Sequence, residues 1–508
     1  KSKVMALGIS LLLFLGFATP ISKSFIGNPL FRFLSGYSGH YSDFLGYGSY
    51  LPLFLWRLIF GFSLIVLLFL SFFIVKFRGK KTFKLLLFSG CLLLLLASIS
   101  GSQYLNDYQQ RDELNEIAEK VNYEKTYRTY QKIPKPTITK VTTEIDLYPE
   151  LQRYHLKGHY VMINKHSQPI DSILISVPRD FELISLTYHY KTETLEMKQH
   201  LSELRLTESI APEETATLEF ELAYQLKAVN NHESFNAILE NGSFKRISRY
   251  FPQLGYNSEN EISDKSIRAK NALGHVSTLT KLEAPKVYTD DFIALSMQIS
   301  TPKSQIAIGT GELKDQWQHE GRNYYHYFAD AIPFRFAVSS AKYYLKKEQH
   351  KDISINVLYH PLHGNNVAHL IENTKLSLDY CTENFGPYPF KSITYAEVSS
   401  FTQGFAGTAY PGVIFMTEHM TFNANIDAGE NQDVVNELAG HEVAHFWWGT
   451  NQIDPDYREG YAMLTESLAM YTEMMIYKKM YGRKQMKERL AIHKQIYDSQ
   501  KSIKVMLI

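Results

Sequence analysis

The sequence predicts a multidomain fold in which transmembrane α-helices precede an antiparallel β domain and a mostly α-helical domain. Uncharged apolar runs fill much of residues 1–101, short alternating β-like runs fill residues 138–345, and helix-like patterns dominate residues 346–508. We expect a stalk or linker at residues 102–137, between the membrane part and the β domain. A chain of 508 residues is too long for one ordinary domain, in agreement with this division.

The first part of the chain has the character of a membrane anchor. Three apolar runs, at residues 4–22, 58–75 and 85–100, approach the length of about 20 residues that spans a bilayer. The first also resembles the apolar core of a signal peptide, but two further runs follow it closely, so we expect three transmembrane helices. Basic residues crowd the loop between the second and third runs, namely Lys76, Arg78, Lys80, Lys81 and Lys84. By the positive-inside rule this loop is cytoplasmic, and everything after residue 101 lies outside the cytoplasm of a bacterial-type plasma membrane.

Composition narrows the classes of function. The formal net charge is +1, whereas a nucleic-acid-binding chain is usually strongly basic. Cys91 lies in an apolar run and Cys381 in a distant polar region, so a disulfide between them is not expected. The chain starts at Lys1 without a methionine and stops abruptly at Ile508, and we expect residues to be missing at both ends.

The soluble part changes from β-like to α-like patterns along the chain. Residues 107–131 predict a charged helix, which we interpret as a solvated stalk. Period-two alternation predicts strands at residues 141–147, 159–163, 172–177, 182–190, 216–224, 294–299 and 324–328. A further strand at residues 353–359 is expected at the edge of the β domain or in the hinge that follows. Helices are expected at residues 365–384, 431–449, 461–481 and 483–500.

One short motif carries the chemistry. His441-Glu442-Val443-Ala444-His445 reads H-E-x-x-H within a helical run. Positions i and i+4 of a helix share one face, so His441 and His445 can bind one Zn²⁺, and Glu442 is placed to act as the base on a metal-activated water. The alternative is a pair of ordinary helix histidines beside a solvated glutamate. Trp447 and Trp448 follow on the same helix and are expected to pack it against its neighbours.

A catalytic zinc usually has three protein ligands, so a third must lie downstream. Glu459, Glu466 and Glu473 are the candidates. Glu459 lies in a polar, loop-like stretch, and Glu473 lies two turns beyond Glu466 on the same amphipathic helix. We therefore expect Glu466 to be the ligand and Glu473 to stand behind the ligands or face solvent.

These residues resemble the M1 family of zinc metallopeptidases, the gluzincin aminopeptidases. The resemblance rests on His441–Gly449 and Thr465-Glu466-Ser467-Leu468-Ala469, with support from the stretches 249–256, 359–361 and 384–390, and it covers roughly residue 138 to the C-terminus. It implies a β saddle followed by a thermolysin-like catalytic domain, with Zn²⁺ as cofactor and peptides as substrates. Twenty residues separate His445 from Glu466, two more than the family pattern. A longer loop of this kind costs little closure entropy.

The chain also resembles a divergent branch in which such a domain follows segments like those of an ABC-type transporter permease. An ABC-type ATPase or further membrane segments are then possible partners, besides the lipid bilayer. His360 and His363 flank Pro361 and raise the idea of a second metal site, but we interpret them as isolated loop histidines.

Two departures from the family pattern bear on activity. In the family, a glutamate upstream of the zinc helix holds the free α-amine of the substrate, and the matching position here is Ala409. Glu418 is close in sequence, but we expect it to be a solvated carboxylate, so exopeptidase and endopeptidase specificity both stay open. The run at residues 393–398 is expected to form the cleft edge where a peptide adds as a strand. The family's oxyanion-stabilising tyrosine is expected beyond Ile508.

Two functions are therefore in competition. The first is zinc-assisted peptide hydrolysis outside the cytoplasm, with His441, His445 and Glu466 as ligands and Glu442 moving the proton from water to the leaving amine. The second is a transporter- or sensor-associated module that binds peptides with a degenerate peptidase domain. Ala409 favours the second, and the intact His441, Glu442 and His445 favour the first.

Overall fold

The computed structural model of the chain divides into two units, residues 1–113 with 226–233 and residues 114–225 with 234–508. It describes residues 5, 7–9, 11–12, 26, 28–32, 41–108, 113–226, 236–285, 290–402, 404–426 and 433–506. The first expected transmembrane helix, residues 4–22, therefore lies for the most part outside the described residues.

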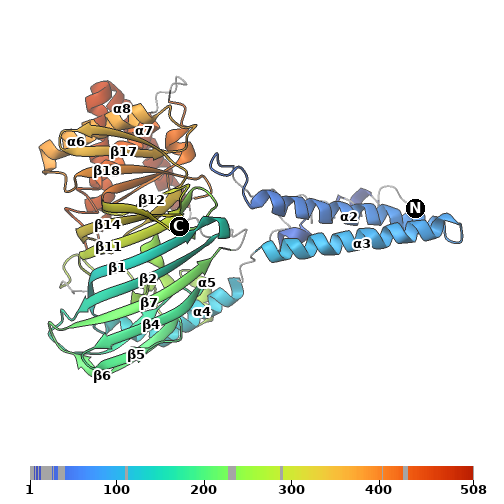
Figure 1. The fold of residues 1–508 in the computed structure, drawn as a ribbon, viewed down its shortest axis with the longest axis horizontal. Helices are drawn as coiled ribbons and strands as arrows, with labels where there is room; N and C mark the ends of the chain where they lie inside the picture. The colour runs from blue at the N-terminus through green and yellow to red at the C-terminus, as the bar shows by residue number, and fades with distance from the viewer. Residues whose placement is uncertain are drawn as a thin grey trace. The chain divides into compact units, whose positions relative to one another are not determined.

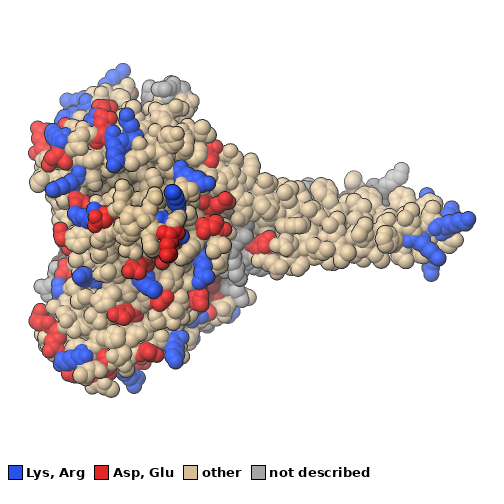
Figure 2. All heavy atoms as spheres, viewed as in Figure 1, with Lys and Arg blue, Asp and Glu red and all other residues tan. Residues whose placement is uncertain are grey.

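The first unit contains a helical hairpin. Helix α2 (Tyr50–Lys76) and helix α3 (Thr82–Asp107) lie side by side and are the two helices, among the described residues, that are long and apolar enough to cross a membrane (Figure 1). They extend the expected runs 58–75 and 85–100 at both ends. Figure 2 shows an uncharged surface along most of the hairpin and a basic cluster at its tip, where the chain turns from α2 to α3.

A long sheet dominates the β part of the second unit. Its strand order is β13-β14-β11-β1-β2-β7-β4-β5. The bounds are β1 (Thr137–Tyr148), β2 (Arg153–Ile163), β4 (Phe181–Tyr190), β5 (Glu193–Glu196), β7 (Thr215–Gln225), β11 (Ile293–Pro302), β13 (Glu312–His319) and β14 (Arg322–Ile332). Alternate side chains of β1, such as Val141 and Ile145, are fully buried, as the period-two pattern predicts.

Smaller sheets complete this part. One has the order β10-β3-β6, with β3 (Ile170–Ser176), β6 (Leu201–Ile210) and β10 (Gln253–Leu254). The other has the order β12-β15-β9-β8, with β8 (Asn236–Ala237), β9 (Ser243–Lys245), β12 (Ile306–Gly309) and β15 (Val338–Ala341). The expectation of a purely antiparallel domain is wrong in one respect, because β1 and β11 pair in parallel through Lys140↔Ala294 to Asp146↔Ser300.

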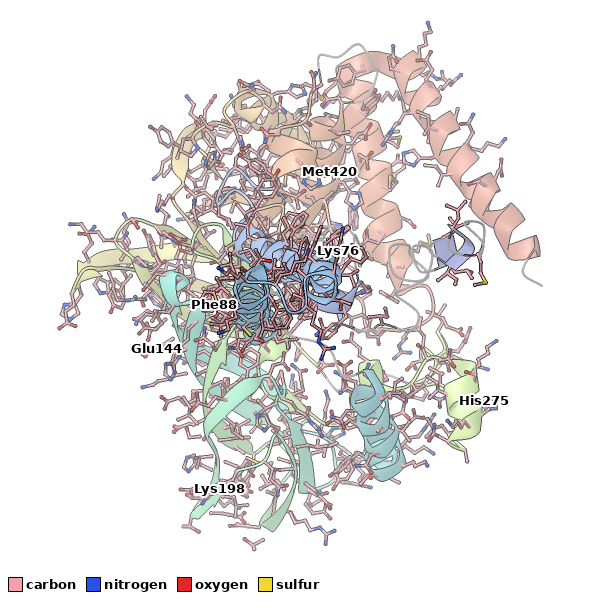
Figure 3. All side chains as sticks on the ribbon, turned by 90° about the vertical axis from the view of Figure 1, so that its right-hand side faces the viewer. Lys76, Phe88, Glu144, Lys198, His275 and Met420 are labelled. Carbon is pink, nitrogen blue, oxygen red and sulfur yellow. The ribbon has the colours of Figure 1, made fainter. Side chains whose placement is uncertain are left out.

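Helix α4 (Glu113–Tyr127) differs from the solvated stalk expected there. Glu124 is buried and receives two hydrogen bonds, at 2.6 and 2.9 Å, from Arg268 of helix α5 (Lys265–Lys270). The Tyr123 ring stacks on Tyr256 with centroids 5.2 Å apart. Figure 3 shows α4 beside the segment that carries His275, whose carbonyl oxygen accepts a hydrogen bond from Arg128. A buried charge persists only when it is paired in this way, so α4 belongs to the folded domain.

The helical part of the second unit surrounds a five-stranded mixed sheet of order β16-β17-β18-β20-β19. Its strands are β16 (Tyr344–His350), β17 (Ile353–Tyr359), β18 (Ser392–Val398), β19 (Gly407–Tyr410) and β20 (Val413–Thr417). The strand expected at 353–359 is therefore neither an edge of the β domain nor a hinge, because it pairs with β16 and β18 inside this sheet.

Helices α6 (Val367–Phe385), α7 (Val434–Ala444) and α8 (Leu468–Met506) accompany this sheet, with single turns η7 (Glu418–Phe422) and η8 (Met463–Ser467). The two helices expected at 461–481 and 483–500 meet at Gly482, which has a φ of +84°. Glycine tolerates this left-handed backbone, and Figure 3 shows the two parts of α8 running in different directions from that point. Cys91 and Cys381 are both free, as expected.

Candidate metal centre

Helix α7 owes its orientation to a row of buried apolar residues. The side chain of Asp433 caps its start by accepting a 3.0 Å hydrogen bond from the Asn436 N–H. Val435, Ala439 and Val443 recur every four residues, are fully buried and pack in the core of the helical part. His441 is two residues, or about 200° of helix rotation, from Ala439 and Val443. The histidines therefore project from the face opposite to this core.

Three donor atoms converge on that face. The Nε2 atoms of His441 and His445 are 3.2 Å apart, and the Oε2 atom of Glu466 lies 3.4 Å from the first and 3.8 Å from the second. All three atoms lie within 4.8 Å of one another. Ligands that bind one zinc tetrahedrally at about 2.0–2.1 Å are roughly 3.3 Å apart. Two imidazole nitrogens and one carboxylate at these distances fit Zn²⁺.

Close packing of two helices brings Glu466 to this place. A Cβ atom added at Gly440 would lie 3.7 Å from the Cα atom of Glu473, so α7 and α8 approach each other closely at this glycine. Glu466 lies one turn before α8, in η8, and reaches back across the histidines. The longer gap between His445 and Glu466 is taken up by the connection between the two helices.

The second ring nitrogen of each histidine also lies near an acceptor oxygen. Nδ1 of His445 lies 2.9 Å from the carbonyl oxygen of Trp448, and a carbonyl only accepts, so Nδ1 carries the proton and Nε2 presents its lone pair. Nδ1 of His441 lies 3.5 Å from Oε2 of Glu473, whose side chain is only 4% exposed. A carboxylate behind a histidine of this kind fixes the ring and raises its basicity.

The electrostatics of the site favour a cation. Burial lowers the pKa of His441, but the carboxylates of Glu466, Glu473 and Glu442 outweigh it and raise the pKa to about 10. His441 in turn lowers the pKa of Glu466. A divalent ion at Nε2 of His441 would take the place of the proton that these carboxylates favour there.

Glu442 lies against the edge strand of the mixed sheet. It is 6% exposed, and a Cβ atom added at Gly407 in β19 would lie 2.9 Å from its Cγ and 3.0 Å from its Oε1. The expectation that residues 393–398 form the cleft edge is wrong, because β18 lies between β17 and β20. The edge belongs to β19, whose only strand partner among the described residues is β20.

A comparison with models of known protein families finds a match for the helical part of the second unit. Residues 369–506 match a model of the peptidase family M1 domain. This segment is similar to M1 peptidase domains, and we refer to it below as the M1 domain. The assignment supports a zinc metallopeptidase and implies Zn²⁺ as its cofactor.

Solved structures add a weaker likeness. Two crystal structures of an M1 zinc metallopeptidase from Deinococcus radiodurans, one of them a point mutant, are similar to the chain at 13% sequence identity. Each match covers 72% of this chain and 75% of the other, with TM-scores of 0.49 for the mutant and 0.47 for the second structure. These scores are too low to infer a shared activity. A search of curated proteins finds no match.

Within the M1 domain, α7 is shorter than the expected helix at 431–449, of which residues 431–432 lie outside the described residues. It ends at Ala444 and continues as a turn, in which the N–H groups of Phe446 and Trp447 bond the carbonyls of Val443 and Ala444, before Gly449 takes a φ of +113°. The two tryptophans pack as expected. Nε1 of Trp447 donates to the carbonyl of Gly386 at 3.0 Å, and Nε1 of Trp448 donates to Oγ1 of Thr472 at 3.2 Å.

The remaining candidate residues of the M1 domain fall outside the three converging donors. Ala409 is buried in β19 opposite Ile414 and offers no carboxylate. Glu418 is not solvated as expected, since it is buried and accepts a 2.9 Å hydrogen bond from the Ser400 N–H. Glu459 is exposed, and its N–H bonds the carbonyl of Thr280.

His363 is not an isolated loop histidine. Its ring is buried, with Nδ1 2.5 Å from Oε1 of Glu397 at the end of β18 and Nε2 3.0 Å from Nδ2 of Asn423. Burial raises the pKa of Glu397 to about 7, although His363 lowers it. No spacing rule links residues 363 and 397, so the sequence offered no signal for this pair.

Proposed function

We propose that the chain is a membrane-anchored zinc metallopeptidase that hydrolyses peptide bonds outside the cytoplasm. In this proposal His441, His445 and Glu466 hold the metal and Glu442 is the general base. One observation carries it: two imidazole nitrogens and a carboxylate oxygen lie within 4.8 Å, directly beside a buried glutamate. In the described part of the chain the Glu442 carboxylate forms no ion pair, and burying such a group is costly, which favours a chemical role for it.

Each residue then has a defined task. When bound, Zn²⁺ supplies the Lewis acidity that acidifies a water molecule and polarises a peptide carbonyl. Glu442 accepts the proton of that water at its carboxylate and returns it to the nitrogen of the leaving amine. The Trp448 carbonyl keeps His445 in the tautomer that presents Nε2. Glu473 holds the ring of His441 in place from behind.

The position of β19 at the end of its sheet, as far as the described residues show, supports a peptide as substrate. A peptide adding to this edge would extend the sheet by main-chain hydrogen bonds, next to the Gly407 backbone on which Glu442 packs. Glu442 would then face the main chain of the bound peptide.

The apolar hairpin supports the membrane anchor. Helices α2 and α3 have 27 and 26 residues, enough to cross a hydrocarbon core of about 30 Å with some tilt. The turn between them carries the basic cluster visible at its tip in Figure 2, which favours a cytoplasmic turn. The M1 domain would then lie on the outer side of the membrane.

A second candidate function is a peptide-binding module that does not hydrolyse. Ala409 favours it, because a methyl group in place of the family's amine-holding carboxylate removes one anchor of the substrate. Ala409 also matters for exopeptidase specificity. Comparing the hydrolysis of peptides with a free and with an acetylated N-terminus tests this specificity.

The deciding experiment compares Glu466→Gln with Glu459→Gln in the full-length protein. We expect Glu466→Gln to lose most of its zinc and its peptide hydrolysis, and the exposed Glu459→Gln to keep both. Hydrolysis of free and N-acetylated peptides by the wild type would mark a broad peptidase, and hydrolysis of the free peptide alone would mark an aminopeptidase. If the wild type binds zinc but hydrolyses neither peptide, the second candidate function, the peptide-binding module, is supported instead. If both variants hold equal amounts of zinc, Glu466 is not a zinc ligand.

A further inference from the structure

The long sheet of the second unit has a hollow on one face. It has a volume of about 460 Å³ and is lined by residues of β1, β11, β13 and β14, which lie next to one another in the sheet. Sites for small ligands usually have volumes of about 300–1,000 Å³. Figure 3 shows Glu144, which lines the hollow, on the side of the sheet that faces away from helices α4 and α5. The hollow therefore lies on a face that these two helices do not cover.

The strand register places four of the lining side chains in one row across the sheet. Glu144 of β1 lies opposite Gln298 of β11. His326 of β14 in turn lies opposite both Gln298 and Asp315 of β13. Residues directly opposite in neighbouring strands point to the same face, with Cβ atoms roughly 5 Å apart. A carboxylate, an amide, an imidazole and a second carboxylate thus form a continuous polar row over four strands.

The hydrogen-bonding groups of the polar row are largely unused within the protein. In the described part of the chain, the side chains of Glu144 and Gln298 form no hydrogen bond or ion pair, although Gln298 is only partly exposed. The neighbouring row on the same face differs, because Ser300 donates a hydrogen bond to Asp146 and Arg322 donates one to Ser300. The polar row therefore has donors and acceptors that a ligand can meet, whereas its neighbour is bonded internally.

An exposed tryptophan borders the polar row and also lines the hollow. Trp317 of β13 is 40% exposed and stacks on Tyr324 of β14, with ring centroids 5.3 Å apart and an interplanar angle of 10°. Tyr324 supports one face of the indole and holds it in place. A rigid aromatic side chain gives a large contact area and loses little conformational entropy when it binds a ligand.

The charges around the hollow favour a neutral ligand. Each carboxylate has a basic neighbour, since Glu144 lies opposite Lys157 of β2 and Asp315 lies 3.9 Å from Nδ1 of His326. Lys157 is shared with Glu221 of β7, at 4.0 Å. The two carboxylates would repel an anion. A cation would use these carboxylates alone and leave the amide and the imidazole of the polar row without a partner.

We propose that this hollow binds a neutral glycan, with a sugar ring lying on Trp317 and sugar hydroxyl groups bonded to the polar row. The C–H face of a pyranose ring is apolar and packs on an aromatic ring, whereas its hydroxyl groups both donate and accept hydrogen bonds. Glu144 and Asp315 are acceptors for these hydroxyl groups, and Gln298 is both a donor and an acceptor. Four strands about 4.8 Å apart span roughly 14 Å, which is longer than one sugar ring, so we expect a segment of a glycan chain.

The hollow uses none of the residues assigned to the metal centre. The inference is therefore independent of the proposed peptidase function and adds a second binding site to the β part of the same unit.

The test measures the binding of oligosaccharides to the full-length protein by isothermal titration calorimetry. The neutral probes are cellohexaose, maltohexaose, mannohexaose and chitohexaose, each at millimolar concentrations. Hexagalacturonate is the acidic probe, and hexalysine is a cationic chain of the same number of units. We expect at least one neutral probe to bind more tightly than both charged probes. If no neutral probe binds, or if a charged probe binds more tightly than all four, the inference is wrong.

Variants locate the binding site. Trp317→Ala removes the aromatic surface and should weaken glycan binding at least about tenfold. Gln298→Ala removes an amide of the polar row and should weaken it about tenfold. Tyr344→Ala is the control for the tryptophan, because Tyr344 is 61% exposed on the edge strand β16 and its ring lies 6.4 Å from that of Tyr359 on the next strand. Gln318→Ala, an exposed neighbour of Trp317 that does not line the hollow, is the control for Gln298.

Thermal unfolding, zinc content and peptide hydrolysis are measured for each variant and should stay at the wild-type level. Wild-type glycan affinity in folded Trp317→Ala and Gln298→Ala overturns the inference and leaves the proposed peptidase standing. Equal weakening in the two control variants also overturns it, because the glycan then binds elsewhere.

Discussion

Gly407 should be essential for activity although it carries no functional group. A Cβ atom at this position would lie 2.9 Å from Glu442 Cγ, 3.0 Å from Oε1 and 3.2 Å from Cδ. Carbon atoms in ordinary contact are about 3.5–4.0 Å apart, so Gly407→Ala must displace the Glu442 side chain by about 0.5–1 Å. A shift of about 1 Å in a catalytic group can lower turnover about a hundredfold. We expect kcat to fall between about tenfold and a hundredfold.

The assay measures kcat together with zinc content and thermal stability for each variant. The Glu442 side chain can rotate away, and β19 is an edge strand, so zinc content should stay near the wild-type value and thermal stability should change little. Gly364→Ala is the matched control, because its added Cβ would lie 3.7 Å from Tyr359 Cε2, the nearest described atom outside its own chain neighbours, and this distance is ordinary contact. Wild-type kcat in Gly407→Ala would refute the placement of Glu442 against β19.

Three further changes test other parts of the molecule. Glu473→Gln should weaken zinc binding about 10–100-fold by loosening the ring of His441, as measured by competition with a chelator. Lys245 is fully buried, its Nζ has no hydrogen-bond partner among the described residues, and burial lowers its pKa to about 7. Between about pH 7 and pH 10 the Lys245 amine is therefore protonated in the unfolded chain and largely neutral in the folded one. The free energy of unfolding should rise with pH by about 3 kcal/mol across that range. In denaturant titrations, Lys245→Met should be more stable than the wild type at neutral pH and should lose this pH dependence. Gly158→Ala would place a Cβ 2.1 Å from the buried Phe220 ring and should destabilise the β domain by about 1–3 kcal/mol or more in thermal unfolding, whereas an unchanged midpoint would contradict that packing.

Local patterns predicted much of the fold because they depend on near neighbours. The alternation of β1 and a helix that carries the H-E-x-x-H motif appear in the structure where they are expected. The parallel pairing of β1 with β11 was not predicted, because alternation is the same in parallel and antiparallel strands and the partners are far apart in the chain. Helix α4 was misjudged because Arg268, which neutralises its buried Glu124, lies 144 residues away.

Likewise, some residues of the candidate site could be predicted from local sequence patterns and others could not. The i, i+4 spacing placed His441 and His445 on one face, and the amphipathic pattern around Glu466 pointed to the third donor. Gly407 and the pair His363–Glu397 had no signal in the sequence, because each acquires its role from a contact made only in the folded chain.

The central claim is that Glu442 moves the proton in a zinc-dependent hydrolysis. Its most direct test is Glu442→Gln in the full-length protein, with zinc per chain and peptide hydrolysis measured on the same sample. The amide has nearly the same shape but no basic oxygen, so the variant should hold one zinc per chain, as the wild type does, and lose turnover by about 10²–10⁴-fold. Retained hydrolysis by Glu442→Gln, or a wild-type protein that binds no zinc, would contradict the account.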